Sequence, residues 1–162
     1  MRTADEGERA VASAVKHYDE ALVTYYEDQL LVHSDALYRF AVGLTLSPEL
    51  ARQCVLKTYR NVAKDLENVK GTAGDAQALV ALIAECGKCY GELRGKASGE
   101  TTVPVLAALK ALAEPLRAAL VAVDVVGLSP EEAARALGAS EADLRSRLAQ
   151  ARKGLVASKG EF

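Results

Sequence analysis

Residues 129–155 read SPEEAARALGASEADLRSRLAQARKGL, and this stretch decides the fold of the C-terminal part of the chain. Ser129 can cap a helix through its hydroxyl and Pro130 suits the first helical position, so a helix is predicted to start there. Gly138 stands where a left-handed residue would end that helix, and Ser140 offers a second cap. Apolar residues then recur at helical spacing, at Leu144, Leu148, Ala151 and Leu155. Two short helices joined by a tight turn containing glycine predict a helix-turn-helix.

The second helix of this pair carries basic side chains away from its leucine stripe. These are Arg145, Arg147, Arg152 and Lys153, which are available on that side for phosphates and base edges, and a helix in this position is shaped to lie in the DNA major groove. Glu141 and Asp143 lie on the same helix and would repel phosphate. A plain helical hairpin with a solvated charged face is therefore the alternative to a DNA-binding helix.

Composition indicates an all-α protein of two small helical domains. Half of the 162 residues are hydrophobic, mainly Ala, Leu and Val, with few aromatic residues and no Trp. The formal net charge of −2 argues against a chain that coats nucleic acid indiscriminately, so any DNA contact must be local. No apolar run approaches the roughly 20 residues that span a bilayer, and the N-terminus is polar. These features predict a cytoplasmic protein without a membrane partner.

The three cysteines could mark a metal or redox site, or simply fill a core. Cys86 and Cys89 form a C-x-x-C pair, but no second pair of ligands follows at matching spacing, and His17 and His33 are isolated. An odd number of cysteines fits a reducing compartment better than a disulfide framework. The favoured interpretation is that Cys54, Cys86 and Cys89 are small buried thiols, with no metal and no cofactor.

Upstream, apolar residues at three- and four-residue spacing predict a helical N-terminal domain. Its predicted helices run up to about Val32, across Leu37 to Leu44, from Pro48 to about Val69, and from Asp75 to Leu93. Gly, Ser and Thr then dominate a stretch typical of a flexible connection. The predicted boundaries are 1–94 for the first domain, 95–103 for the linker and 104–162 for the second domain.

Two parts of the chain resemble bacterial sigma factors of the extracytoplasmic-function (ECF) class. Leu112-x-x-Pro-Leu-Arg117, followed by GLSPEEAARALGAS and LRSRLAQARKGL, resembles the fourth conserved region, which in that family holds the promoter −35 element. Residues 36–66, ALYRFAVGLTLSPELARQCVLKTYRNVAKDL, resemble the second conserved region, which in that family binds the clamp helices of RNA polymerase and melts the −10 element. By the same resemblance, residues 71–74 would form the loop that captures a flipped base.

One segment departs from the family pattern. Where family members carry acidic side chains toward the polymerase, this chain has Arg52, Gln53 and Lys57. Turning an attractive pair into a like-charge pair is penalised when it is desolvated at an interface. Gln53, Leu56 and Lys57 are accordingly predicted to mark a polymerase-binding face whose charge has changed.

The leading hypothesis is an ECF-type sigma factor that recognises promoter DNA and joins core RNA polymerase. Its predicted DNA-contacting residues are Ser140, Glu141, Arg145, Arg147 and Arg152. The alternative is a sigma-like protein that acts through protein partners, such as an anti-sigma factor, and not through polymerase.

Two other classes rank lower. A helix-turn-helix regulator that binds DNA alone usually needs a dimer, and no heptad zipper is visible in the sequence. An enzyme is not predicted, because no nucleophile with a matched base, no paired carboxylates and no phosphate-binding glycine loop stand out.

Overall fold

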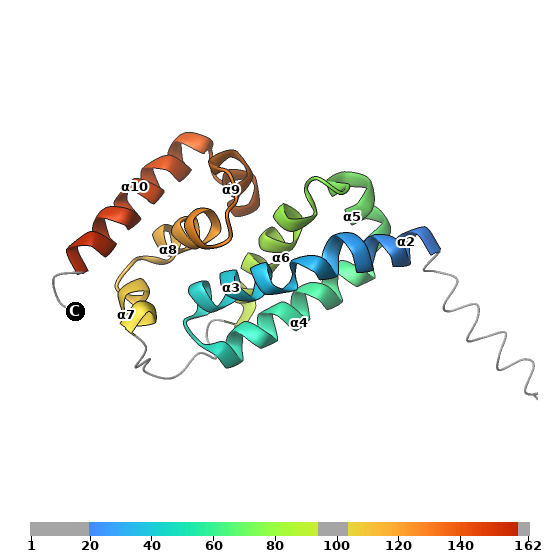
Figure 1. Cartoon of the computed structure of the whole chain (residues 1–162), viewed down its shortest axis with the longest axis horizontal. Coiled ribbons are helices and arrows are strands. Elements are labelled where there is room, and N and C mark those ends of the chain that lie inside the picture. Colours follow the sequence, from blue (N-terminus) through green and yellow to red (C-terminus); the bar gives the residue numbers. More distant parts are fainter. Residues whose placement is uncertain (1–19, 94–103, 159–162) are drawn as a thin grey trace, which may run out of the picture.

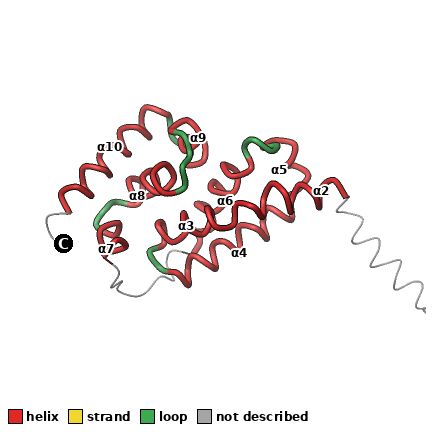
Figure 2. Tube along the Cα trace, in the orientation of Figure 1, coloured by secondary structure: helices red, strands yellow, loops and turns green. Residues whose placement is uncertain are grey.

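The computed structural model describes residues 20–93 and 104–158, and all of its regular elements there are helical (Figure 2). The first group comprises α2 (Glu20–Tyr25), the π-helical turn η1 (Tyr26–Leu30), the 3-10 turn η2 (Leu31–His33), α3 (Ser34–Thr45), α4 (Pro48–Lys64), α5 (Leu66–Ala73) and α6 (Ala78–Leu93). The second group comprises α7 (Pro104–Lys110), α8 (Glu114–Leu120), the π-helical turn η4 (Val121–Val125), α9 (Pro130–Leu137) and α10 (Glu141–Ser158). The predicted all-α class is confirmed.

The two groups lie side by side in space, with α2 to α6 at one end of the molecule and α7 to α10 at the other (Figure 1). In the first group α4 packs against both α3 and α6, and in the second α10 packs against α8 and α9. Contacts between α6 and α9, and between α3 and the α8–η4 segment, join the groups. The predicted linker 95–103 lies outside the described residues, so the domain boundaries remain a prediction.

The first two predicted helices, one up to about Val32 and one across Leu37 to Leu44, form one continuous helical rod in the structure. From α2 the chain widens into η1, tightens into η2 and continues directly into α3, and the His33 side chain makes no capping hydrogen bond. Two tyrosines tie this rod to its neighbours: the Tyr25 hydroxyl donates to the Gly74 carbonyl at 2.7 Å, and the Tyr59 hydroxyl donates to the Leu30 carbonyl at 3.0 Å. These tyrosines are buried structural residues.

The helix predicted from Pro48 to about Val69 is broken into two. At Asp65 the backbone leaves helical geometry, with φ −125° and ψ 33°, so α4 ends at Lys64 and α5 begins at Leu66. Most of the segment predicted as a loop, residues 71–74, belongs to the end of α5. The chain turns at Gly74, where φ is +57°, a value that favours glycine.

A buried arginine connects the two groups of helices. Arg117, near the middle of α8, is only 6% exposed. Its Nε donates to the Leu44 carbonyl at 3.2 Å, and its Nη1 donates to the Leu112 carbonyl at 3.1 Å. Leu44 lies in the last turn of α3, where carbonyls lack partners within the helix and a positive charge complements the helix dipole.

We predict that Arg117→Met lowers the free energy of unfolding by about 2–4 kcal/mol, because it leaves the buried carbonyls of Leu44 and Leu112 without donors. Urea unfolding followed by circular dichroism measures the change. Arg39→Met, on the exposed side of α3, is the matched control and should alter stability by less than about 0.5 kcal/mol. Equal losses in both variants would contradict the role assigned to Arg117.

Candidate nucleic-acid interface

Capping interactions define the helix-turn-helix formed by α9 and α10. The Ser129 hydroxyl accepts from the Glu132 amide at 3.1 Å, and the Glu132 carboxylate accepts from the Ser129 amide at 3.1 Å, which is a complete capping box. Gly138 ends α9 in the left-handed conformation, with φ +65°. The Ser140 hydroxyl then accepts from the Asp143 amide at 3.1 Å and caps α10. The predicted helix-turn-helix is therefore confirmed in its local detail.

The leucine stripe of α10 holds the helix against its support. Leu144, Leu148 and Ala151 are buried, and α10 packs on α8 and α9. At 100° per residue, five of the exposed residues on the opposite side of the helix form what we call the reading face: Ala142, Ser146, Ala149, Gln150 and Lys153. Four of these five side chains are small or neutral, so the backbone of α10 can approach another surface closely.

None of the reading-face residues was among the predicted DNA-contacting residues, although Lys153 belonged to the basic side predicted for this helix. The reading-face residues could have been found by projecting residues 141–158 onto a helix and taking the side opposite the leucines. The Gln150 amide nitrogen donates to the Ser146 hydroxyl at 3.2 Å, so two polar groups on this face are already oriented toward each other.

Arg145 flanks the reading face and is held by Glu141. Its Nε and Nη2 donate to the same oxygen of Glu141, Oε1, at 3.2 and 2.8 Å. The Arg145 side chain is 62% exposed. An exposed pair of this spacing is worth only about 0.3–0.5 kcal/mol, so the guanidinium can exchange its carboxylate for a stronger partner.

Arg152 forms an ion pair with a residue outside the helix-turn-helix. Its Nε and Nη2 donate to the two carboxylate oxygens of Asp124 in η4, at 3.0 and 2.7 Å. This bidentate pair joins the C-terminal half of α10 to η4 and neutralises one of the predicted cations.

Arg147 lies on the opposite flank of α10, toward the N-terminal group of helices. It lines a hollow of about 400 Å³ together with Tyr90 of α6, Glu114 of α8 and Leu137 of α9. Burial, assisted by a hydrogen bond with Glu114, raises the pKa of Tyr90. The structure thus separates the predicted arginines: Arg145 lies beside the reading face, whereas Arg147 faces the hollow.

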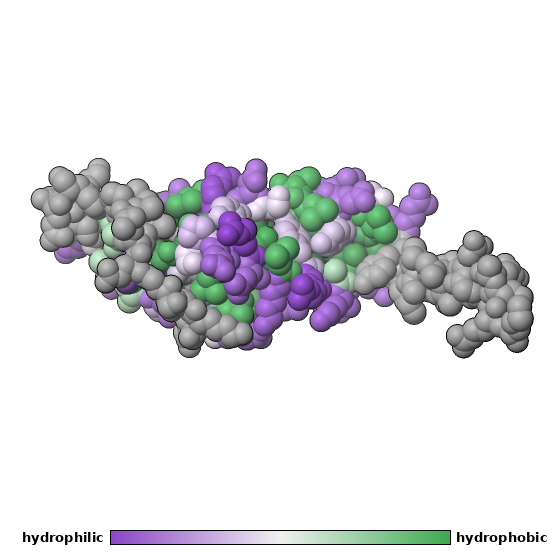
Figure 3. All heavy atoms as spheres, turned by 90° about the horizontal axis from the view of Figure 1, so that it is seen from below, coloured by the Kyte–Doolittle hydropathy of each residue, from purple (hydrophilic) through white to green (hydrophobic). Residues whose placement is uncertain are grey.

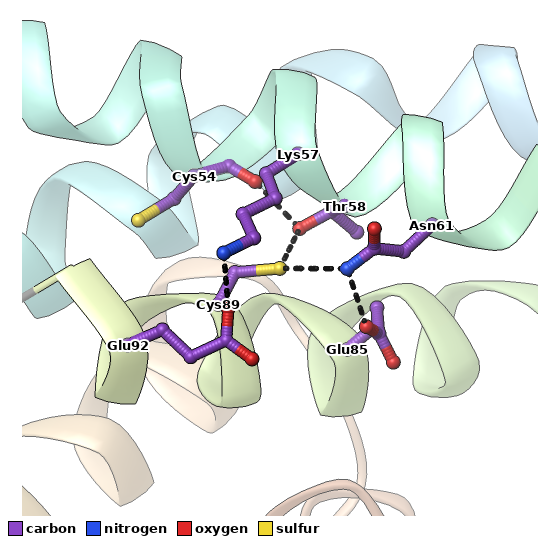
Figure 4. Close-up of polar contacts among 7 residues, drawn as sticks. All are labelled: Cys54, Lys57, Thr58, Asn61, Glu85, Cys89 and Glu92. Carbon is purple, nitrogen blue, oxygen red and sulfur yellow. Dashed lines mark hydrogen bonds and ion pairs between the residues drawn. The ribbon is translucent and has the colours of Figure 1, made fainter.

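The residues predicted to contact polymerase lie on α4. Gln53 and Leu56 are exposed, whereas the Lys57 ammonium forms an ion pair with Glu92 of α6 (Figure 4). The hydrogen bond to Glu92 raises the pKa of Lys57. Sequence reasoning missed this pair because its members are 35 residues apart.

The three cysteines lie in the interface between α4 and α6 and are all free and buried. The Thr58 hydroxyl donates to the Cys54 carbonyl at 2.7 Å and lies 3.8 Å from the Cys89 sulfur (Figure 4). Burial raises the pKa of Cys54 to about 11 and that of Cys86 to about 12. The prediction of small buried thiols is confirmed.

The described residues, 20–93 and 104–158, include neither a metal-binding cluster nor a membrane-spanning helix. No group of three or more His, Cys, Asp or Glu residues there is arranged to hold a metal ion. None of the helices there combines the length and apolar character that crossing a bilayer would require.

The C-terminal part of the chain matches a known protein family. Residues 102–155, about a third of the chain, match the family model described as Sigma-70, region 4, and this range includes α7 to α9 and most of α10. Comparisons with curated proteins and with solved structures found no match. The C-terminal third is therefore similar to a helix-turn-helix DNA-binding domain of a non-enzymatic family of transcription factors. The resemblance of residues 36–66 to the second conserved region stays a prediction.

We predict that the thiols react slowly while the protein is folded. Because the pKa values of Cys54 and Cys86 lie above those of free thiols, both groups stay protonated at pH 8, and the thiolate is the reactive form. Labelling with a chromogenic disulfide reagent at pH 8 should be slow in buffer and rapid in denaturant. Rapid labelling of all three cysteines in the folded protein would contradict their burial.

Proposed function

We propose that this protein is an ECF-type sigma factor, in which α10 reads a promoter −35 element and the N-terminal helices engage core RNA polymerase. One observation carries the proposal: a capped helix-turn-helix within the sigma-70 region 4 match presents an exposed reading face. The proposed role implies a cytoplasmic location, where promoter DNA and polymerase are found.

The chemistry of α10 supports groove reading more than bulk attraction to DNA. Small side chains at Ala142 and Ala149 let the helix enter the major groove, while Ser146 and Gln150 offer donors and acceptors to base edges. Lys153 makes no ion pair with any described residue and is available for a phosphate. Arg145 can leave Glu141 for a base or a phosphate at low cost.

A second candidate function is a sigma-like protein that acts through protein partners, including an anti-sigma factor, instead of polymerase. The observation that favours it is the charge of the predicted polymerase-binding face on α4. Lys57 forms an ion pair with Glu92. Arg52 is exposed at a position where the ECF sigma factors that this segment resembles have a carboxylate. A basic face would repel the basic polymerase surface that this family's acidic side chains meet.

We expect Arg145→Ala to weaken specific DNA binding by about 1–3 kcal/mol, because a guanidinium that reads a base is lost. The probe is a duplex selected by the wild-type protein from a random library, and the measurement is fluorescence anisotropy at fixed salt. Arg39→Ala replaces an exposed arginine on α3, outside the helix-turn-helix. It is the matched control and should leave the affinity for DNA unchanged. Wild-type affinity in Arg145→Ala would mean that this arginine is only solvated.

We expect Asp124→Asn to strengthen DNA binding at low salt, in contrast to Arg145→Ala. Removing this carboxylate releases Arg152 from its bidentate pair, and one additional phosphate contact steepens the dependence of log K on log salt by about 1. The same duplex is titrated over a range of salt concentrations. Asp35→Asn on α3 removes an exposed carboxylate outside the helix-turn-helix and should not change the slope.

Polymerase binding separates the two candidate functions. For a sigma factor, purified protein and core RNA polymerase should co-elute in gel filtration and give promoter-dependent transcripts. For an interaction protein, the wild type should elute separately, and Arg52→Glu combined with Gln53→Glu should gain affinity for polymerase because both substituted residues are exposed on α4. Nanomolar affinity in the wild type would rule out the interaction-only function.

A further inference from the structure

The outward side of α4 forms a defined surface, which we call the α4 face. Its inner side is buried against α3 and α6 through Leu50, Ala51, Cys54, Thr58 and Val62. The exposed residues on the other side are Glu49, Arg52, Gln53, Leu56, Arg60 and Lys64. This face carries three cations and one carboxylate, on a chain whose formal net charge is −2.

The cations of the α4 face have no ion-pair partner among the residues that the structure describes. Arg52, Arg60 and Lys64 make no ion pair or side-chain hydrogen bond with any residue of the described ranges. On the adjoining side of the same helix, Lys57 is neutralised by Glu92, and on α10 both Arg145 and Arg152 have carboxylate partners. The electrostatic potential at the α4 face is therefore more positive than at α10, where two arginines are paired with carboxylates.

An exposed leucine lies among these cations. Leu56 is 64% exposed, between Arg52 and Arg60 at four-residue spacing along the helix. The view from below, toward the side on which α4 lies in Figure 1, shows strongly hydrophilic residues beside hydrophobic ones over the middle of the molecule (Figure 3). An apolar side chain flanked by two cations has, on a small scale, the apolar centre and polar rim of a protein-binding surface.

We propose that the α4 face binds an acidic amphipathic helix of a partner protein, a proposal that rests on the second candidate function and specifies the chemistry of its partner. Arg52, Leu56, Arg60 and Lys64 recur every four residues over about 18 Å of helix, so a second helix lying alongside would meet them at its own repeat. Glutamate or aspartate at that repeat pairs with the cations, and an apolar residue between them covers Leu56.

Two observations favour a protein partner over nucleic acid at this face. Leu56 at the centre offers nothing to a phosphate backbone, and Glu49 at the start of the helix would repel it. The segment that matches a DNA-binding family is residues 102–155, which does not include α4. The inference is thus independent of DNA reading by α10, and either can fail alone.

The test measures binding of a labelled synthetic helix to the full-length chain by fluorescence anisotropy. The probe is a peptide of about 18 residues with glutamate at four-residue intervals beside a leucine row, and a second peptide has lysine in place of each glutamate. The protein variants are wild type, Arg52→Glu combined with Arg60→Glu, Leu56→Ala, and Arg135→Glu on α9 as a matched exposed arginine without an ion-pair partner among the described residues. Circular dichroism checks that each variant is folded.

We expect the acidic peptide to bind the wild type, to weaken at least about tenfold in the double variant, and to weaken at higher salt. Leu56→Ala should weaken binding with little change in salt dependence, and Arg135→Glu should leave it unchanged. The proposal fails if the double variant binds like wild type, if Arg135→Glu weakens binding equally, or if the lysine peptide binds as well. It also fails if the double variant loses affinity for random duplex DNA in the same proportion, because the face would then be a nucleic-acid surface.

Discussion

The guanidinium of Arg117 is the interaction on which the relative position of the two helical groups depends. A buried cation is costly unless its donors are satisfied, and here backbone carbonyls from α3 and from the turn before α8 satisfy two of them. Next to Leu44, a methyl group on Gly43 would lie 2.6 Å from the Val121 side chain, so only glycine allows η4 to approach α3 this closely. Charge and close packing thus fix α8 and η4 against the end of α3.

This packing also determines what α10 can present. Because α10 rests on α8 and α9, its orientation relative to the N-terminal helices follows from the position of α8 on α3. One flank of α10 is turned so that Arg147 lines the hollow shared with α6, and the other carries Arg145 and Arg152 beside carboxylates. The fold therefore leaves a reading face whose cation, Lys153, has no ion-pair partner among the described residues.

The parts of the structure that could be predicted are those set by neighbouring residues. Ser129, Gly138 and Ser140 act within a few positions of themselves, and their caps appear as the sequence indicated. The partners of Lys57 and Arg152 lie 35 and 28 residues away in the sequence, so no local sequence pattern predicts these ion pairs. Arg117 was visible as part of a family motif, but its burial depends on a carbonyl 73 residues away.

The distribution of charge gives the two basic surfaces different physical characters. On α10 Arg145 and Arg152 are compensated by Glu141 and Asp124, so non-specific attraction to phosphate is weakened and a larger share of any affinity must come from fitted contacts in the groove. On α4 the cations have no ion-pair partner within the described ranges, and two of them flank an exposed leucine, so electrostatic attraction acts at longer range than the apolar contact. Since the chain as a whole is slightly acidic, attraction toward acidic partners is confined to such local surfaces, and the two basic surfaces lie on separate helical groups.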